Sequence, residues 1–310
     1  MTSNRTVLSS LLIASSLLAV PGCIAGDVDD PTTIAAAEAP LSHDDDCCAA
    51  FPRTVSGFDT PESAYWDEGT DAWYVTNMAG SPIEKDGVGW ISKLDRCGNI
   101  VNAKWVSGLN APKGIRIANG KLYTSDMDEL VVVDLATKAV TKIPAPGAIL
   151  LNDPSVGPDG SVYAPDTFGN TIWRFKNGQA SIFVSSPLLD LPNGSIVKGN
   201  DLIIASTGAL VPPITQGKVW KIDLHTKAMT QYGTFEAKMD GIERYKNGYL
   251  IGDSTTVYFV TANGSSVVHD FTADGLDAIN DIGLDPERKL LAVPAYLNHT
   301  VTFYPLRKQL

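Results

Sequence analysis

The chain has 310 residues, of which 44% are hydrophobic and 19% charged, and its formal net charge is −11. This length and apolar content are enough to bury a large core. The acidity argues against a nucleic-acid partner, because binding to phosphates needs clustered Lys and Arg side chains.

Residues 1–22 predict a signal peptide of the lipoprotein type. The run from residue 7 to residue 20 is apolar, follows a single cation, Arg5, and is short for a membrane span. Val20, Pro21, Gly22 and Cys23 resemble a bacterial lipobox, in which the cysteine is lipidated and becomes the N-terminus. We therefore expect an exported protein, lipidated at Cys23 and anchored to a bacterial membrane, in the periplasm or at the cell surface. A plainly secreted protein is the alternative.

Residues 23–50 are small, acidic and Pro-containing, which is typical of a flexible tether. An exported location permits disulfides, so Cys47 or Cys48 can bridge to Cys97, and a bond between the two neighbours is the alternative. No pair of cysteines has C-x-x-C spacing, so we do not expect a zinc site.

From residue 60 onward, six segments begin alike, and a turn and a second short strand follow each of them. Their second residues lie at positions 62, 113, 153, 193, 240 and 281, so the steps are 51, 40, 40, 47 and 41 residues. A period near 40 with several strands per unit is typical of propeller blades. We predict an all-β, six-bladed β-propeller over residues 51–310. Residues 51–58 should add an outer strand to the last blade and so close the circle.

The second position of each repeat is polar, and in a propeller such equivalent positions face one another across the central channel. These residues are Glu62, Lys113, Asp153, Asn193, Asp240 and Asp281. Buried unpaired carboxylates are costly, and Lys113 can offset only one of them. A hard cation such as Ca²⁺ takes carboxylate and amide oxygens as ligands, so we expect a divalent cation on the axis. Taken singly, Asn193 would be only the Asn-Gly turn of a hairpin.

The repeats resemble those of the SMP-30/gluconolactonase-like six-bladed propellers, whose more distant relatives include the paraoxonases and diisopropyl fluorophosphatase. The resemblance covers roughly residues 57–306 and rests on "TPESAYWDEGTDAWYVTN", "LLNDPSVGPDGSVYAPDT", "LPNGSIV" and "MDGIERYKNGYLIGD". It implies an axial divalent cation with Glu62, Asn193 and Asp240 as ligands, and Asn152 against the metal or the substrate. The chain differs from the family at two places. Lys113 stands where paraoxonases have a histidine, and Leu150 and Leu151 precede Asn152 where gluconolactonases place an arginine.

The same resemblance implies a chemistry for the site. A bound cation could polarise a lactone or ester carbonyl and stabilise the oxyanion that forms. Asp240 is the candidate to orient or deprotonate the attacking water. Lys113 could assist the oxyanion or hold a substrate carboxylate or phosphate, with charge balance in the channel as the alternative. Asn152, Lys113, Asp153 and Asp281 are the candidate substrate contacts.

Two classes of function remain open. One is a metal-dependent hydrolase of a lactone, ester or related small molecule. The other is a non-catalytic propeller with a structural metal, which presents the insertions at residues 78–91 and 207–220 to a ligand or a partner protein. The sequence has no G-x-S-x-G or H-E-x-x-H motif, so serine-hydrolase and zincin mechanisms lack their signatures. We expect a monomer that acts on a small molecule and contacts the membrane only through the lipid.

Overall fold

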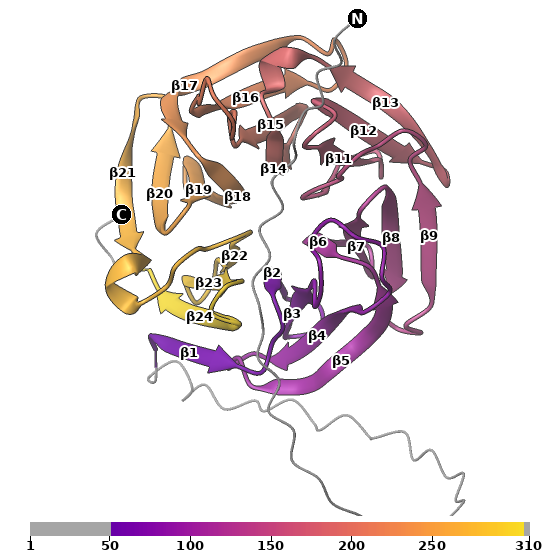
Figure 1. Ribbon diagram of the computed structural model, residues 1–310, viewed down its shortest axis with the longest axis vertical. Coiled ribbons are helices and arrows are strands. Elements are labelled where there is room, and N and C mark those ends of the chain that lie inside the picture. The colour runs from indigo at the N-terminus through magenta and orange to yellow at the C-terminus, as the bar shows by residue number, and fades with distance from the viewer. Residues whose placement is uncertain (1–50, 307–310) are drawn as a thin grey trace, which may run out of the picture. The chain divides into compact units, whose positions relative to one another are not determined.

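A computed structural model describes residues 51–306 of the chain. In this part six four-stranded antiparallel sheets lie around a common axis as the blades of a propeller (Figure 1). The six-bladed fold predicted from the repeats is therefore confirmed. The expected signal peptide, tether and lipidation at Cys23 lie outside the described residues.

The strands follow one another in chain order within each of blades 1 to 5. Blade 1 contains β2 (Pro61–Asp67), β3 (Ala72–Asn77), β4 (Gly89–Asp95) and β5 (Ile100–Leu109), and blade 2 contains β6 (Pro112–Ala118), β7 (Lys121–Asp126), β8 (Glu129–Asp134) and β9 (Val140–Pro144). Blade 3 contains β10 (Ser155–Val156), β11 (Val162–Asp166), β12 (Thr171–Lys176) and β13 (Gln179–Ser185), and blade 4 contains β14 (Pro192–Lys198), β15 (Asp201–Ser206), β16 (Gly217–Asp223) and β17 (Met229–Ala237). Blade 5 contains β18 (Met239–Tyr245), β19 (Gly248–Asp253), β20 (Thr256–Thr261) and β21 (Gly264–Asp270).

Blade 6 joins the two ends of the described chain. It contains β22 (Gly283–Asp285), β23 (Leu290–Ala295), β24 (Thr300–Pro305) and, on its outer edge, β1 (Arg53–Ser56). Strand β1 pairs antiparallel with β24, which confirms the predicted closure and covers an edge that would otherwise be open. Next to this closure the ring of Trp73 from blade 1 packs edge-on against Phe303 of blade 6, with 5.3 Å between ring centroids.

Two short 3-10 helices, η2 (Pro187–Leu189) and η3 (Phe271–Asp274), interrupt the β-structure. Of the helices in the described part of the chain, neither has the length and apolar character needed to span a membrane. Cys97, in the turn between β4 and β5, is disulfide-bonded. The predicted bond to Cys47 or Cys48 lies outside the described residues and stays a prediction.

Each innermost strand begins at the same end of the propeller, which we call the proximal end; the opposite end is the distal end. The second strand of a blade returns to the proximal end, the third leaves it and the fourth returns, so the two kinds of loop alternate between the ends. A β-bulge follows the first residue of β2, β6, β14 and β18. The bulges disturb the strand pairing at the positions where the polar residues of the repeats lie.

Exposed apolar side chains gather at the proximal end. Twelve large hydrophobic side chains are well exposed among residues 51–306, and three of them, Val140, Ile182 and Val267, lie on outermost strands. The other nine lie on loops at the proximal end, and none lies on a distal turn. We call these nine the apolar crown: Ile83, Val88, Ile149, Phe168, Leu188, Leu210, Val211, Ile214 and Leu297.

Candidate functional site

The strand pairing determines which residues form the polar ring around the axis. Four inner strands pair their first residue with the last residue of the next strand, as Pro61 does with Asn77. Leu151 makes the same contact with Asp166 at the start of blade 3. The backbone N–H groups of Asn152 and Asn280 then donate to the equivalent carbonyls of Pro165 and Pro294. The ring, one residue further along each blade, therefore consists of Glu62, Lys113, Asn152, Asn193, Asp240 and Asn280.

This register corrects the alignment made from the sequence in blades 3 and 6. Asp153 and Asp281 were placed in the ring, but each follows it by one residue, and Asn280 was missed. Both aspartates are fully buried. Their expected contact with a substrate stays a prediction, and full burial argues against it.

The aspartates explain why glycine follows the ring residue in blades 2 and 5, each of which precedes a blade that carries one of them. A Cβ on Gly114 would lie 2.4 Å from Oδ1 of Asp153, and a Cβ on Gly241 would lie 2.4 Å from Oδ1 of Asp281. Real Cβ atoms do not come so close to another atom, so each glycine leaves room for the carboxylate of the next blade. Gly194 leaves room in the same way for the backbone oxygen of Asp240. The Asn-Gly pair at 193–194 thus lies within β14 and is not the hairpin turn.

Four of the ring residues meet through their side chains. In the orientation that satisfies its hydrogen bonds, the Asn152 amide nitrogen donates to Oε1 of Glu62 at 3.3 Å and to Oδ1 of Asp153 at 3.0 Å. The amide oxygen of Asn152 then lies 2.9 Å from Oδ1 of Asn193, so two acceptor oxygens face each other there. Asn193 is in turn hydrogen-bonded to Asp240, and this bond opposes part of the rise in pKa that burial causes in that carboxyl. Glu62, Asn152, Asn193 and Asp240, from blades 1, 3, 4 and 5, therefore form one connected group.

Several oxygens in and below this group have no hydrogen-bond partner although they are buried. They include Oε2 of Glu62, Oδ1 of Asp240 and Oδ1 of Asn280. Burial raises the pKa of Glu62 well above its usual value, against the opposing charge of Lys113. Burial, and then the charge of Asp281, raise the pKa of Asp240 to about 7. Buried carboxylates without partners are costly, so this group favours a bound proton or a bound cation.

The donor set suits a hard cation. Carboxylate and amide oxygens are ligands that Ca²⁺ accepts, and two carboxylates match the charge of a divalent ion. No three His, Cys, Asp or Glu side chains of residues 51–306 are arranged to hold a metal. A cation at the ring would therefore depend on the amides of Asn152 and Asn193 as well as on Glu62 and Asp240.

Lys113, the cation of the ring, is turned toward a loop. Its Nζ donates to the backbone oxygen of Pro82 at 3.0 Å and lies 2.8 Å from Sδ of Met78. Both partners belong to the proximal loop between β3 and β4. Burial lowers the pKa of Lys113, while the charges of Glu62 and Asp240 act in the opposite direction. Lys113 therefore links the ring to this loop.

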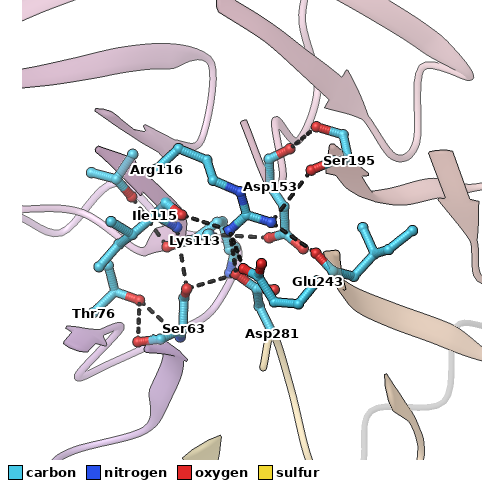
Figure 2. A network of polar contacts seen from close by, with 12 residues as sticks. Ser63, Thr76, Lys113, Ile115, Arg116, Asp153, Ser195, Glu243 and Asp281 are labelled. Atoms are coloured by element: carbon cyan, nitrogen blue, oxygen red, sulfur yellow. Dashed lines mark hydrogen bonds and ion pairs between the residues drawn. The ribbon is translucent and has the colours of Figure 1, made fainter. Parts of the chain in front are cut away.

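A second charged layer, which the sequence analysis missed, lies three residues beyond the ring. Figure 2 shows Arg116 at its centre, with its guanidinium among side chains of several blades. Its Nη1 lies 3.3 Å from Oε1 of Glu243 and 3.7 Å from Oδ2 of Asp281. Its Nη2 donates to the backbone oxygen of Ile242 at 2.9 Å. An Arg and a Glu at equivalent positions of two repeats were the signal that could have identified this layer.

The two layers contain more negative than positive groups. Five carboxylates and two cations lie around the axis: Glu62, Asp153, Asp240, Asp281 and Glu243 against Lys113 and Arg116. Burial raises the pKa of Asp153 well above its usual value and that of Glu243 to about 7. Ser63 relieves part of the imbalance by donating to Oδ2 of Asp281 at 2.6 Å. A divalent cation at the ring would reduce the rest.

Comparison with known proteins supports the fold but not a particular reaction. No family model matches the chain, and no curated protein matches it in sequence. A gluconolactonase from Xanthomonas campestris is similar in structure, with a TM-score of 0.61 and 13% identity over 82% of this chain and 90% of that chain. A catalytically inactive virginiamycin B lyase from Staphylococcus aureus, solved with quinupristin, has a TM-score of 0.54 and 14% identity over 81% of this chain and 97% of that chain. Both are six-bladed propellers, so the resemblance inferred from the repeats is confirmed at the level of the fold.

Proposed function

We propose that this propeller is an exported, divalent-metal-dependent hydrolase of a lactone, an ester or a related small molecule. Glu62, Asn152, Asn193 and Asp240 would hold the ion, which we propose to be Ca²⁺. The observation that supports this most is the connected group of these four side chains, with buried carboxylate oxygens that lack a partner. The gluconolactonase among the similar structures makes a lactone a reasonable first substrate class.

A cation bound at the ring would act as a Lewis acid toward a substrate carbonyl oxygen. Asp240 as a whole is partly exposed although its unpaired Oδ1 is buried, so its carboxylate could orient a water and accept its proton. Asn152 would position the substrate beside Glu62. Lys113 adds positive charge close to Glu62 and Asp240, which would favour an oxyanion at the proximal side of the ring.

Metal binding can be tested without activity. A ligand that binds only the folded protein raises its stability, by about 2.7 kcal/mol at a concentration of 100 times Kd. We expect Ca²⁺ to raise the melting temperature of the parent protein and a chelator to reverse the rise. Asn193→Ala combined with Asp240→Ala should abolish the rise. Asn280→Ala, which removes the ring amide outside the proposed ligand set, should retain it. An unchanged rise in the double variant would show that the ligand assignment is wrong.

Catalysis needs a separate measurement. The parent protein with Ca²⁺, Mg²⁺, Mn²⁺ or Zn²⁺ should hydrolyse some member of a panel of lactones and aryl esters, and Asp240→Ala should be inactive toward it. Calcium stabilisation together with rates equal to those of Asp240→Ala across the panel would favour the second function, a propeller with a structural metal that presents its loops. The hydrogen bond from Lys113 to the backbone oxygen of Pro82 favours this second function, because it directs the ammonium group of Lys113 to a loop and not to a substrate.

Export and the lipid anchor at Cys23 are part of the same proposal. Mass spectrometry of the mature N-terminus tests both, since lipidation predicts a chain that begins with a modified Cys23. A mature chain that begins at another residue and carries no lipid would contradict the lipid anchor and favour the alternative, a plainly secreted protein.

A further inference from the structure

The apolar crown is a property of one end of the molecule. All nine of its side chains are on proximal loops, and no large hydrophobic side chain is exposed on a distal turn of residues 51–306. Single exposed hydrophobic residues are ordinary on protein surfaces, but a set confined to one end marks a surface that contacts something apolar.

The crown surrounds the axis and does not line one groove. Ile83 is 61% exposed on the loop of blade 1 between β3 and β4, and Val211 is 73% exposed on the loop of blade 4 between β15 and β16. These two blades lie on opposite sides of the axis (Figure 1). Leu188 is 60% exposed on the loop that leads into blade 4. A partner that contacts the whole crown must therefore extend across the axis.

We propose that the apolar crown docks the proximal end onto a lipid surface, a contact in addition to the lipid at Cys23 that was expected to be the only one. Its members are aliphatic apart from Phe168, and they include none of the Trp, Tyr and Arg side chains that dominate protein–protein hot spots. Aliphatic side chains do partition into the boundary between headgroups and acyl chains. The predicted lipid at Cys23 would keep such a surface within reach, because residues 24–50 can span at most about 95 Å.

Charge indicates which lipid the crown prefers. Exposed side chains on the proximal loops include the acids Glu84, Asp86, Asp274 and Asp277, with Lys85 as an exposed cation among them. Acidic loops are repelled by anionic headgroups, so on anionic lipid this repulsion would oppose the free energy gained by burying the crown. The crown therefore favours zwitterionic lipid over anionic lipid. This proposal does not depend on whether the ring is catalytic.

The test reads the contact directly, in the full chain bound to phosphatidylcholine vesicles. An environment-sensitive dye is attached at Ile83→Cys or Val211→Cys in the crown, and at Ile182→Cys or Val267→Cys as controls. The two control side chains are each 57% exposed, but they lie on the outermost strands β13 and β21. The labelled parent chain gives the background from its own cysteines. We expect a blue shift of the dye emission at both crown positions and at neither control position.

A second pair of variants guards against an effect of the dye itself. Val211→Asp with Ile214→Asp should weaken the shift of a dye at position 83, with at least about a tenfold loss in partitioning for each side chain kept out of the lipid. Ile182→Asp with Val267→Asp should leave that shift unchanged. Replacing part of the phosphatidylcholine by phosphatidylglycerol should reduce the shift.

Several results would overturn the proposal. These are a chain that does not associate with vesicles, equal shifts at crown and control positions, a shift on one side of the axis alone, and a shift that requires anionic lipid. A shift that grows with protein concentration in the absence of vesicles would overturn it too, because the crown would then contact a second copy of the chain.

Discussion

Replacing Arg116 by methionine removes the cation that lies between Glu243 and Asp281. Their carboxylate oxygens lie 3.3 and 3.7 Å from Nη1 of Arg116 and would remain buried without it. Removing one partner of a buried ion pair costs about 3–5 kcal/mol of unfolding free energy, because the other charge is left uncompensated. We therefore expect Arg116→Met to lower the stability by about 4 kcal/mol at pH 8, which corresponds to about 10 °C in melting temperature for a domain of this size.

The pH dependence separates charge from packing in this prediction. Burial raises the pKa of Glu243 to about 7 and that of Asp281 to about 6, so both carboxyls are mostly protonated in the folded protein at pH 5. A neutral carboxyl does not need the guanidinium, so Arg116→Met should cost less than half as much at pH 5 as at pH 8. The backbone oxygens of Ile115 and Ile242 lose their hydrogen bonds at either pH.

The assay is urea unfolding at pH 5 and pH 8 of four proteins: the parent, Arg116→Met, Glu243→Gln and the double variant. Glu243→Gln removes one of the charges, so the double variant should be more stable than the sum of the single effects predicts, by about 1–3 kcal/mol. Equal losses at the two pH values together with additive effects would refute the reasoning. Arg116 would then stabilise the fold through packing and backbone hydrogen bonds alone.

Three further predictions concern the ring and its neighbours. The parent protein should lose stability as the pH rises from about 4.5 to 7, because burial raises the pKa of Glu243 from 4.5 to about 7 and the folded state keeps a proton that the unfolded chain releases. This group accounts for up to about 3 kcal/mol of unfolding free energy. Glu243→Gln should therefore flatten the dependence of the unfolding free energy on pH, measured by urea unfolding. Gly241→Ala should lower the melting temperature by several degrees because its Cβ would lie 2.4 Å from Oδ1 of Asp281, whereas Gly69→Ala, whose nearest such contact is 3.6 Å, should leave it within a degree or two. Lys113→Met should release the loop between β3 and β4, seen as faster amide exchange at residues 79–88; Lys85→Met, which breaks the exposed pair with Asp128, should not change that exchange.

The six blades could be predicted from the sequence because each repeat contains its own strand, turn and strand. Segments such as "PESAYW" and "DAWYVTN" pair with each other locally, so their recurrence alone determines the number of sheets. The closing strand followed from the same logic, since a sixth blade with three strands would leave an open edge. Glu62, Asn193 and Asp240 were identified because each is the second residue of the first strand of its blade.

Only the tertiary structure determined which side chains of different blades contact one another. The chain carries Asn and Asp side by side in blades 3 and 6, and only the pairing of Leu151 with Asp166 shows that Asn152 is in the ring and Asp153 beneath it. Arg116 appeared as an ordinary strand residue, and its contact with Glu243 spans 127 positions (243 − 116) along the sequence. Contacts of this kind depend on how far each strand is rotated and displaced about the axis. A repeat pattern does not contain that information, because every blade satisfies it equally well.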